Sequence, residues 1–539
     1  MSSSGGISRR QFVSGLFAAS LAGTCSLGVR RTAFAHVDYS IDDTVRACIP
    51  ISPVETMWHF PRPFEVELIR GSDRLRSALT NRALDIIRSG FSPDRFGEPE
   101  LLSVPKPSAP GMRQFSVFEP GDLLVYNSLA VQLAREFESL RPRSDQNVVF
   151  SYRGNPERID FVGGIQSHRA FRQQAKYSDR AIDSEYILKA DIKEFYPSIP
   201  LDNLENSLSR LTRQEKIAEY LMRLVRHWNS NFDGGLLIGS LASSLLAEAL
   251  LIPVDQNLLR EGFQYCRFSD DFVFFCSSQD EAHDALDAVT QAVGNIGLAI
   301  NPSKTKILRK KVGQAADRYE IVASNRLDER ISQVESGAPP ENASPMVRGA
   351  MRSLKRVDFD ELYVTAMETQ ARGDIQRWIR SAVFLRNMHH TRLAAQFVAE
   401  HTHHTAFFVS TVKRAIRRRT QAGRDRMLGN VSELLLDDAS HPFSRLKGLV
   451  LVRGSAIGAS RATRFLREGD GTDDGYLHRL ALECLGTEPA ARSVAERYLH
   501  STHGWCRRAA IRKLPMATDK QHKQFGNGKD DPITNELCA

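Results

Sequence analysis

The stretch RFSDDFVFFC, residues 267–276, places two aspartates side by side between strongly apolar flanks. The flanks are rich in aromatic residues and predict two strands, over 264–270 and 272–276, with Asp270 and Asp271 at their connection. Adjacent carboxylates repel each other, and one of them tends to bind a proton when no cation is near. An Asp-rich hairpin turn explains the pair without any function. A divalent cation is the alternative explanation, because the cation neutralises both side chains, although for the pair alone the turn is favoured.

A phosphoryl-transfer site built on these aspartates needs a third carboxylate from elsewhere in the chain. Mg²⁺ prefers hard oxygen ligands, and two such ions about 3.5–4 Å apart can hold the attacking and the leaving oxygen of an in-line transfer. The segment KADIKEFYPSI (189–199) supplies Asp191 near the end of an apolar strand predicted over 186–192. We therefore expect Asp191 to lie beside the 270–271 turn.

The predicted elements around these residues alternate in the manner of an α+β fold. Helical patterns are predicted over 123–137, 201–227, 236–255 and 281–297. Strand-rich segments are predicted over 147–153, 186–192, 264–276 and 298–308. This order favours an antiparallel sheet with helices on one face.

The carboxyl-terminal part of the chain is predicted to be almost wholly helical over 346–515. Within it, the pattern Tyr476-x-x-Arg479-x-Ala481-Leu482 matches Trp505-x-x-Arg508-x-Ala510-Ile511. Two copies are compatible with a helical-repeat array, which needs three or more units for stability, and also with a coincidence of helix packing. The basic stretch KRAIRRR (413–419) is interpreted as a solvated helix face, with a phosphate-binding stripe as the alternative.

Composition limits the function less than the motifs do. A formal net charge of +8 favours a polyanionic partner, but a merely basic surface explains it as well. The seven cysteines are scattered without zinc spacing, which argues against both a disulfide framework and a zinc site. The histidines between His389 and His404 are interpreted as a solvated helix face rather than as metal ligands.

The amino terminus has the features of an export signal. Arg9 and Arg10 precede an apolar run that ends in Ala33-Phe34-Ala35, a pattern similar to a twin-arginine leader. Few nucleoside triphosphates exist outside the cytoplasm, so an export signal conflicts with phosphoryl transfer from a nucleoside triphosphate. We interpret the leader as an upstream extension, with Met57 as one candidate start, and an exported protein as the alternative. No later stretch is long and apolar enough to span a bilayer.

Together these segments resemble the palm of a reverse transcriptase. Asp191 falls in the family's first palm motif, and RFSDD is similar to the family's aromatic-x-Asp-Asp motif, with Phe268 where tyrosine is commoner. The turn NPSKT (301–305) matches the next motif. Together with the glycine-bounded segment 235–239, four motifs occur in family order. Four motifs in order are far more specific than any one of them.

The segment between these motifs departs from the family at two positions. Gly235 to Gly239, followed by Ser243, matches the spacing of the family's G-L-P-Q-G-x-x-x-S segment. Leu237 and Ile238 stand where proline and glutamine are usual. The resemblance therefore leaves open how the template base is supported.

The resemblance implies a right-hand polymerase with fingers and palm, followed by an all-α, helical-repeat-like domain. The expected organisation is an export-signal-like segment or extension over 1–35, a linker over 36–60, fingers over 61–185, the palm over 186–312, a linker over 313–345, a helical domain over 346–516 and a disordered tail over 517–539.

The resemblance also assigns roles to individual residues. The metal-binding positions are Asp191, Ile192, Asp270 and Asp271, and the three aspartates are catalytic. Lys304 would donate a proton to the leaving pyrophosphate or neutralise it. The substrate-binding positions are Tyr196 as a gate against the ribose 2′-OH, Gly239 and Ser243 as points of close backbone approach, and Arg153 as a contact of the incoming triphosphate.

A palm followed by a long helical region is most like the bacterial abortive-infection and defence-associated reverse transcriptases. We therefore expect a cytoplasmic antiphage polymerase that uses deoxynucleoside triphosphates and two Mg²⁺ ions, with Mn²⁺ as the alternative metal. Its macromolecular partner is an RNA template, a DNA product or both, and not a membrane; homo-oligomer formation stays open. Two alternatives remain: a template-independent or protein-primed nucleotidyltransferase, and a catalytically inactive palm that binds nucleic acid.

Overall fold

The computed structural model describes residues 40–49, 60, 63–89, 91–106, 111–154, 164–230, 234–309, 358–417, 419–437, 439–468, 475–501, 503–514 and 531–538. The export-like segment 1–35, the start candidate Met57 and the predicted linker 313–345 lie outside these residues. Residues 39–539 belong to one structural unit.

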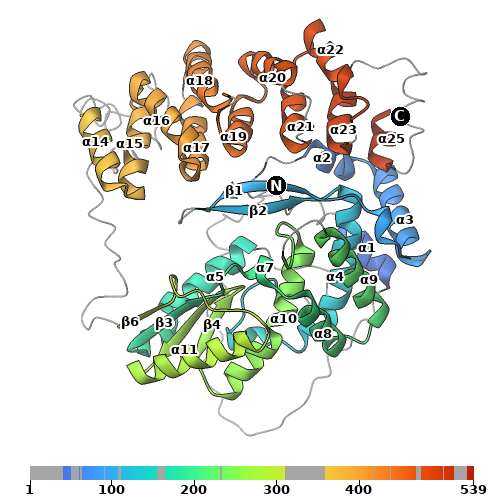
Figure 1. The fold of residues 1–539 in the computed structure, drawn as a ribbon, viewed down its shortest axis with the longest axis vertical. Helices are drawn as coiled ribbons and strands as arrows, with labels where there is room; N and C mark the ends of the chain where they lie inside the picture. The colour runs from blue at the N-terminus through green and yellow to red at the C-terminus, as the bar shows by residue number, and fades with distance from the viewer. Residues whose placement is uncertain are drawn as a thin grey trace, which may run out of the picture. The chain divides into compact units, whose positions relative to one another are not determined.

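A four-stranded antiparallel sheet stands at the centre of the residues that carry the motifs (Figure 1). Its strand order is β4 (Tyr265–Phe268), β5 (Asp271–Cys276), β3 (Tyr186–Asp191) and β6 (Lys306–Arg309). The predicted strands on either side of the Asp270-Asp271 pair are therefore confirmed, as is the strand that ends in Asp191. The described residues have the expected α+β arrangement, an antiparallel sheet packed with helices, followed by an all-helical region.

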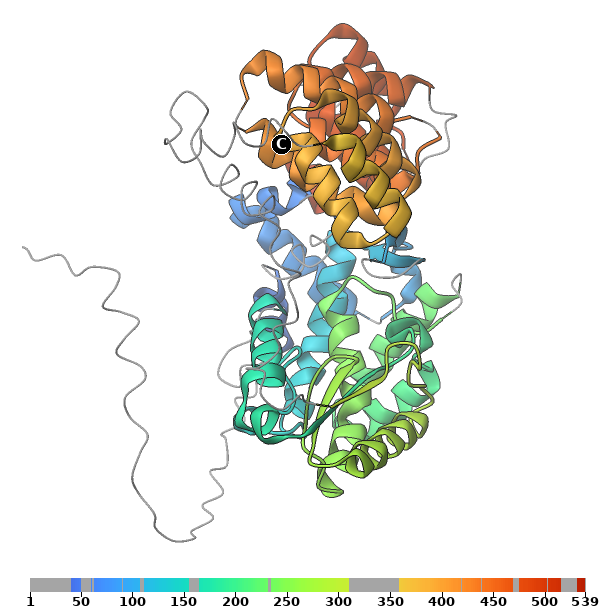
Figure 2. The ribbon, with the colours of Figure 1, turned by 90° about the vertical axis from the view of Figure 1, so that its left-hand side faces the viewer.

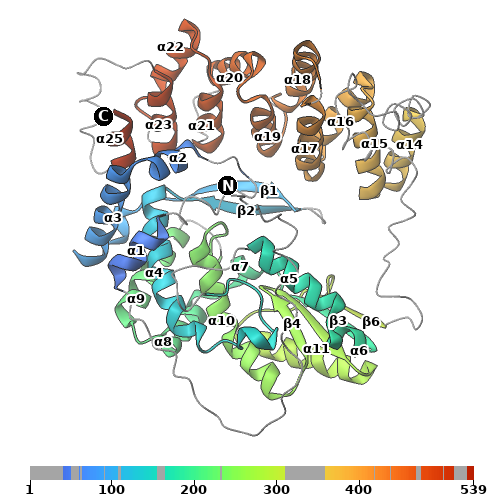
Figure 3. The ribbon, with the colours of Figure 1, turned by 180° about the vertical axis from the view of Figure 1, so that it is seen from behind.

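Alternate residues of β5 bury against helices on the two faces of this sheet, as the two-residue period of a strand requires. Phe272 and Phe274 belong to the main core, together with residues of α10 (Leu241–Arg260) and α11 (Gln279–Gly294). Val273 and Phe275 pack in a second cluster with Phe171 of α5 (Gly164–Tyr177) and Ala181 of α6 (Asp179–Asp183). Figure 3 shows α5 and α6 on the opposite side of the sheet from α11. Helices thus cover both faces, where one covered face was expected.

Two nearly uniformly apolar helices fill the core beside the sheet. Helix α4 (Pro120–Glu138) packs against α10, and 15 of the 19 residues of α4 and 15 of the 20 residues of α10 are buried. A helix that is apolar all round is buried on all sides. The amphipathic helices α8 (Leu201–Leu211) and α9 (Glu215–Asn229) cover this pair with their apolar faces, as their sequence pattern predicted.

The amino-terminal part is more ordered than the sequence indicated. Helix α1 (Ile41–Cys48), inside the predicted linker 36–60, buries Val45 and Cys48 against α4. Helices α2 (Phe64–Gly71) and α3 (Asp73–Arg88) precede a hairpin of β1 (Glu100–Pro105) and β2 (Met112–Val117). The predicted strand 147–153 forms only one bridge, Val149 with Arg267, because the segment runs beside β4 without extending the sheet.

The carboxyl-terminal region is helical, as predicted (Figures 1 and 2). Its α-helices are α14 (Phe359–Thr369), α15 (Arg372–Phe384), α16 (Met388–Glu400), α17 (Thr405–Ile416), α18 (Gln421–Leu435), α19 (Pro442–Val452), α20 (Ala456–Glu468), α21 (Gly475–Cys484), α22 (Pro489–Arg497) and α23 (Gly504–Lys513). Each of the helices α15 to α21 packs against the second helix after it, which is the stacking expected of a helical array. Helix α25 (Pro532–Cys538) lies in the predicted disordered tail and packs on α23 and α3, so that part of the prediction is wrong.

The repeated sequence pattern places two equivalent arginines on one buried carboxylate. Arg479 of α21 lies 3.3 Å from Glu65 Oε2, and Arg508 of α23 lies 3.2 Å from Glu65 Oε1. All three side chains are almost completely buried. Because Glu65 belongs to α2, the repeat ties the helical region to the amino-terminal part of the chain.

Two of the histidines expected on a solvated helix face are buried instead. His390 accepts a hydrogen bond from the indole of Trp378 at 3.2 Å, and His404 packs against Phe397. Both lie in the apolar interior of the helical region, so the prediction is wrong for them. Among the described helices, none combines the length and apolarity needed to cross a membrane.

Candidate active site

The Ser269–Asp270 turn joins β4 to β5 and carries the adjacent aspartates. Phe268 and Asp271 are paired across the hairpin, so the connection has two residues. Ser269 has a φ of 55°, as primed hairpin turns require at their first position. This tight connection brings Asp270 and Asp271 to the same edge of the sheet.

Asp191 stands directly opposite Asp271 in the antiparallel pairing of β3 with β5. The backbone N–H of Ile192 donates to the carbonyl oxygen of Asp270 at 3.2 Å, which attaches the turn to the end of β3. The expectation that Asp191 lies beside the 270–271 turn is therefore confirmed. Like charges directly opposite each other destabilise a sheet, so this register has a cost unless a cation is present.

The NPSKT turn closes over Asp191 from the other side. The backbone N–H of Asn301 donates to the Asp191 carbonyl at 2.7 Å, and its side-chain amide donates to Asp191 Oδ1 at 3.2 Å. The amine of Lys304 lies 2.9 Å from Asp191 Oδ2. Asn301 Oδ1 also accepts from Ser303, which fixes the turn that presents Lys304.

Asp270 and Asp271 release their protons at a higher pH than isolated aspartates do. Burial, and then the charges of Asp271 and Asp191, raise the pKa of Asp270 to about 7. Loss of surrounding water, and then the charge of Asp191, raise the pKa of Asp271, although Lys304 lowers it in part. The site therefore carries more negative charge than its own lysine balances.

This donor set suits a hard divalent cation. The cluster has three carboxylates and the amine of Lys304, and carboxylate oxygens are the ligands that Mg²⁺ or Mn²⁺ prefers. Across the described residues, no three His, Cys, Asp or Glu side chains are already arranged as a ligand group. Both carboxylate oxygens of Asp191 accept from nitrogen donors, Asn301 and Lys304, in this structure. Ile192 has a buried aliphatic side chain, so only its backbone carbonyl could be a ligand.

Tyr196, the expected sugar gate, lies close to the aspartate cluster. It belongs to α7 (Phe195–Ser198), and its hydroxyl donates to Ser244 Oγ at 3.2 Å. Burial, and then Tyr152, raise the pKa of Tyr196, and the charge of Asp270 adds to the shift. Its position next to Asp270 is compatible with contact to a substrate at the cluster.

Gly239 and Ser243 do not face this cluster in the manner expected. Gly239 has a φ of 131°, and a Cβ there would meet the Ser116 carbonyl oxygen of β2 at 2.6 Å. Ser243 is completely buried between Ser240 and Tyr126, whose hydroxyls lie 2.9 and 3.1 Å away. The glycine is required by the close approach of β2. The serine stabilises the start of α10 and is not open to a substrate here.

Arg153 is also engaged within the protein. Its Nε atom lies 2.8 Å from Glu138 Oε1, and its Nη1 atom donates to the Pro142 carbonyl at 2.6 Å. The side chain is largely buried in these contacts. In this structure the guanidinium of Arg153 is therefore not positioned for the predicted contact with a triphosphate.

Several residues at the site were missed from the sequence. Asn301 stood in a recognised motif, but its bond to Asp191 was not foreseen. Ser151, Glu248 and Arg267 lie beneath the Ser269–Asp270 turn and are buried. The one available signal was the position of Arg267, a charge within an otherwise apolar strand.

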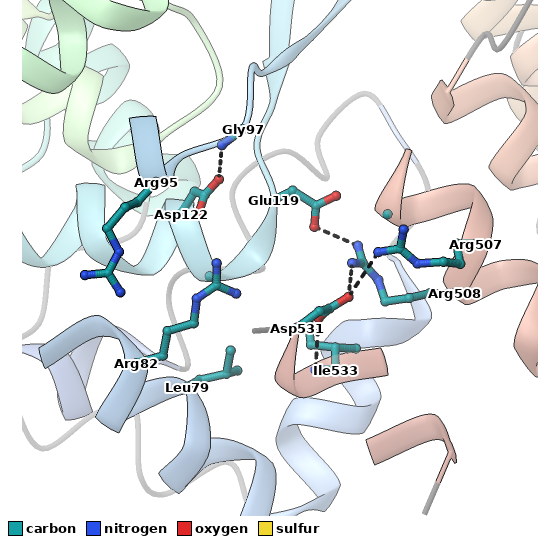
Figure 4. Close-up of a pocket in the computed structure, with 12 residues that line it drawn as sticks. Leu79, Arg82, Arg95, Gly97, Glu119, Asp122, Arg507, Arg508, Asp531 and Ile533 are labelled. Atoms are coloured by element: carbon teal, nitrogen blue, oxygen red, sulfur yellow. Dashed lines mark hydrogen bonds and ion pairs between the residues drawn. The ribbon is translucent and has the colours of Figure 1, made fainter. Parts of the chain in front are cut away.

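A cavity of about 230 Å³ lies elsewhere, where α3, the start of α4, α23 and α25 meet (Figure 4). Arg508 bridges Glu119 at 2.8 Å and Asp531 at 3.0 Å on its wall, and Asp122 accepts from the Gly97 N–H at 2.9 Å. None of the catalytic, substrate-binding or metal-binding residues predicted from the sequence lines it. The candidate active site is therefore the aspartate cluster, where Asp191, Asp270 and Asp271 lie together, and not this cavity.

Comparison with known proteins agrees with this choice. Residues 122–324 match the family model described as reverse transcriptase (RNA-dependent DNA polymerase). No curated protein matches the chain.

Similar solved structures include telomerase from Candida albicans in complex with a fragment of telomeric RNA. That likeness has 11% identity and a TM-score of 0.30, and it covers 64% of this chain and 63% of the other. For telomerase from Candida tropicalis the values are 13%, 0.29, 69% and 64%. The chain thus spans less than two thirds of either telomerase.

Proposed function

We propose that this chain, whose residues 122–324 form a reverse transcriptase domain, is an RNA-directed DNA polymerase. One observation carries the proposal: Asp191, Asp270 and Asp271 converge at one end of the sheet, within a segment that matches the family. Such polymerases position two substrates and balance negative charge, and they need little covalent chemistry from the protein.

In this proposal, the side chains of Asp191, Asp270 and Asp271 and the backbone carbonyl of Ile192 hold two Mg²⁺ ions. When bound, such ions neutralise the charge that develops on the transferred phosphoryl group. The raised pKa of Asp270 supports a cation here, because the cluster lacks enough positive charge of its own. A cation bound at Asp191 competes with the Lys304 amine for the same carboxylate oxygen.

The remaining residues bind and orient the substrates. Lys304 is half exposed at the edge of the cluster, where its amine can neutralise or protonate a leaving pyrophosphate. The ring of Tyr196, anchored by Ser244, stands where it can contact the sugar of an incoming nucleotide. Replacing Tyr196 by alanine should then raise ribonucleotide incorporation relative to deoxynucleotide incorporation.

The direct test is incorporation of labelled deoxynucleotides by purified protein with Mg²⁺, with and without a primed RNA template. The expected product is sensitive to DNase and requires the template. A DNase-sensitive product made without template supports the template-independent alternative, and loss of that product on protease treatment supports priming from the protein. Binding of nucleic acid with no incorporation, unchanged in Asp270→Ala, supports the inactive palm.

We also propose that the enzyme acts in the cytoplasm, where deoxynucleoside triphosphates are available, in defence against phage. The support is the order of domains, a palm followed by an all-helical region. Host cells that carry the wild-type gene should plate phage less efficiently than cells that carry Asp270→Ala. Equal plating on both strains would contradict the defensive role but leave the polymerase activity intact.

A further inference from the structure

The Ser269–Asp270 turn is held on its buried side by groups outside the recognised motifs. The backbone N–H of Ser269 donates to Ser151 Oγ at 2.9 Å. The carbonyl oxygen of Ser269 lies 3.4 Å from Nη1 of Arg267. Both backbone groups of the residue that precedes Asp270 are therefore bound by side chains.

The Ser151 hydroxyl has a fixed direction because it also donates a hydrogen bond. Its proton goes to Glu248 Oε1 at 2.6 Å, which leaves the oxygen lone pairs for Ser269. Glu248 Oε2 in turn accepts from Arg141 at 2.8 Å and from Arg267 at 2.9 Å. Ser151, Glu248 and Arg267 are almost completely buried, so water cannot replace these bonds.

The charges in this network are balanced. Arg267 donates to Asp255 Oδ1 at 2.8 Å and to Oδ2 at 2.5 Å, in addition to its bond with Glu248. Two arginines thus face two carboxylates inside the protein. Removing any one of the four takes a charged partner out of this buried ion-pair network, which destabilises the whole fold. Ser151 is the uncharged member, so its removal tests the turn with the least damage to the fold.

The backbone on either side of Ser151 is fixed beside β4. The N–H of Arg267 donates to the Val148 carbonyl at 2.7 Å, and the N–H of Phe150 donates to the Arg267 carbonyl at 3.1 Å. The segment 148–151 therefore runs alongside the strand that leads into the turn. Ser151 reaches the turn from a fixed position rather than from a loose loop.

Ser269 needs this support because its backbone conformation is unfavourable. A φ of 55° lies in the left-handed region, which a non-glycine residue adopts at a cost in free energy. Such residues persist when the surrounding structure determines their conformation. The hydrogen bonds with Ser151 and Arg267 fix the conformation of Ser269, the residue before Asp270.

We propose that Ser151, oriented by Glu248, is a positioning residue that holds Ser269 in its left-handed conformation and so directs Asp270 toward the substrates. The inference rests on the proposed polymerase function. It assigns no contact between Ser151 and substrate. The segment 148–151, which lies in the predicted fingers, therefore helps to shape the reaction centre of the palm.

The test compares Ser151→Ala with Ser128→Ala in the full chain. Ser128 is equally buried and donates to the Leu124 carbonyl within α4, away from the turn. With a primed RNA template, Ser151→Ala should lower kcat by at least about 10-fold with KM for the deoxynucleotide within about 2-fold, because small misplacements at a reaction centre are costly. Ser269→Gly in the Ser151→Ala background should recover part of kcat, because glycine adopts the left-handed conformation freely. A kcat within 2-fold of wild type, or equal losses in Ser128→Ala, would overturn the proposal.

Amide hydrogen exchange gives a readout independent of catalysis. Ser151→Ala should speed exchange of the peptide that contains the Ser269 N–H, and Ser128→Ala should not. Unchanged exchange there overturns the inference whatever the activity. If the wild-type protein incorporates no deoxynucleotide, the proposed function fails, and exchange alone decides whether Ser151 holds the turn.

Discussion

The side-chain amine of Lys304 lies 2.9 Å from Oδ2 of Asp191, although Asp191 ends the strand β3 and Lys304 belongs to the separate turn that precedes β6. The contact forms because the turn after Asn301 folds back onto the end of β3. Among the described side chains, Lys304 is the one cation bonded to Asp191. The contact places its amine at the edge of the aspartate cluster, where a leaving group could bind.

Replacement of Lys304 by methionine should lower kcat for deoxynucleotide incorporation by about 100-fold, the lower range for loss of a proton donor. The matched control is Lys306→Met, because Lys306 is an exposed lysine on the neighbouring strand β6. Steady-state incorporation rates measure the effect. Equal rates for the two variants would remove Lys304 from the reaction.

The helical region should depend on Glu65 for its attachment to the amino-terminal part of the chain. Glu65→Ala leaves Arg479 and Arg508 without their shared partner, and breaking a buried ion pair costs roughly 3–5 kcal/mol. Glu67→Ala, on the same helix, removes an exposed partner of Arg70 and should change the free energy of unfolding by less than about 1 kcal/mol. Denaturant unfolding of both variants measures the difference. Similar values for the two would contradict the role assigned to Glu65.

Asp122 should make the protein less stable as the pH rises toward neutrality. Burial raises the pKa of Asp122 to about 7, above its ordinary value near 3.8. Between these two values the unfolded chain has released the proton and the folded chain keeps it. The stability from this group is therefore complete below about pH 4 and is lost as the pH rises through about 7.

Thermal unfolding from pH 4 to pH 8 measures this effect. Asp122→Asn, which keeps an acceptor for the Gly97 N–H, should remove a slope of at most about 1.4 kcal/mol per pH unit. The control is Asp85→Asn, at an exposed aspartate paired with Arg95. If the pH dependence of Asp122→Asn equals that of wild type, the carboxyl is not held protonated.

Gly239 should tolerate no side chain, for a structural reason rather than a catalytic one. Gly239→Ala places a Cβ 2.6 Å from the Ser116 carbonyl oxygen, in addition to the strain of a φ of 131°. Gly262→Ala has comparable backbone strain, worth roughly 1–3 kcal/mol, but no atom within 4 Å of the new Cβ. The melting temperature of Gly239→Ala should therefore fall further than that of Gly262→Ala. The opposite order would show that β2 does not lie against this glycine.

The sequence could predict the sheet around the aspartates, because continuous runs of apolar and aromatic residues and a two-residue turn leave a local pattern there. It could not predict α1, whose few buried residues pack on α4, or the β1–β2 hairpin, whose two strands pair only with each other. The burial of Arg479 and Arg508 could not be predicted, because their partner Glu65 is more than 400 residues away. Ser151 carried no signal, since its role depends on the conformation of Ser269.

The central claim is that three aspartates from two strands form one catalytic group. The most direct measurement is the Mg²⁺-dependent rate of deoxynucleotide incorporation by wild-type protein and by Asp191→Ala, Asp270→Ala and Asp271→Ala. Asp284→Ala, at an exposed aspartate of α11, is the control. The account predicts that each cluster variant loses at least about 100-fold in rate, the size expected for one charge-stabilising group, while Asp284→Ala keeps the wild-type rate. Wild-type rates in the Asp191→Ala and Asp270→Ala variants would contradict it.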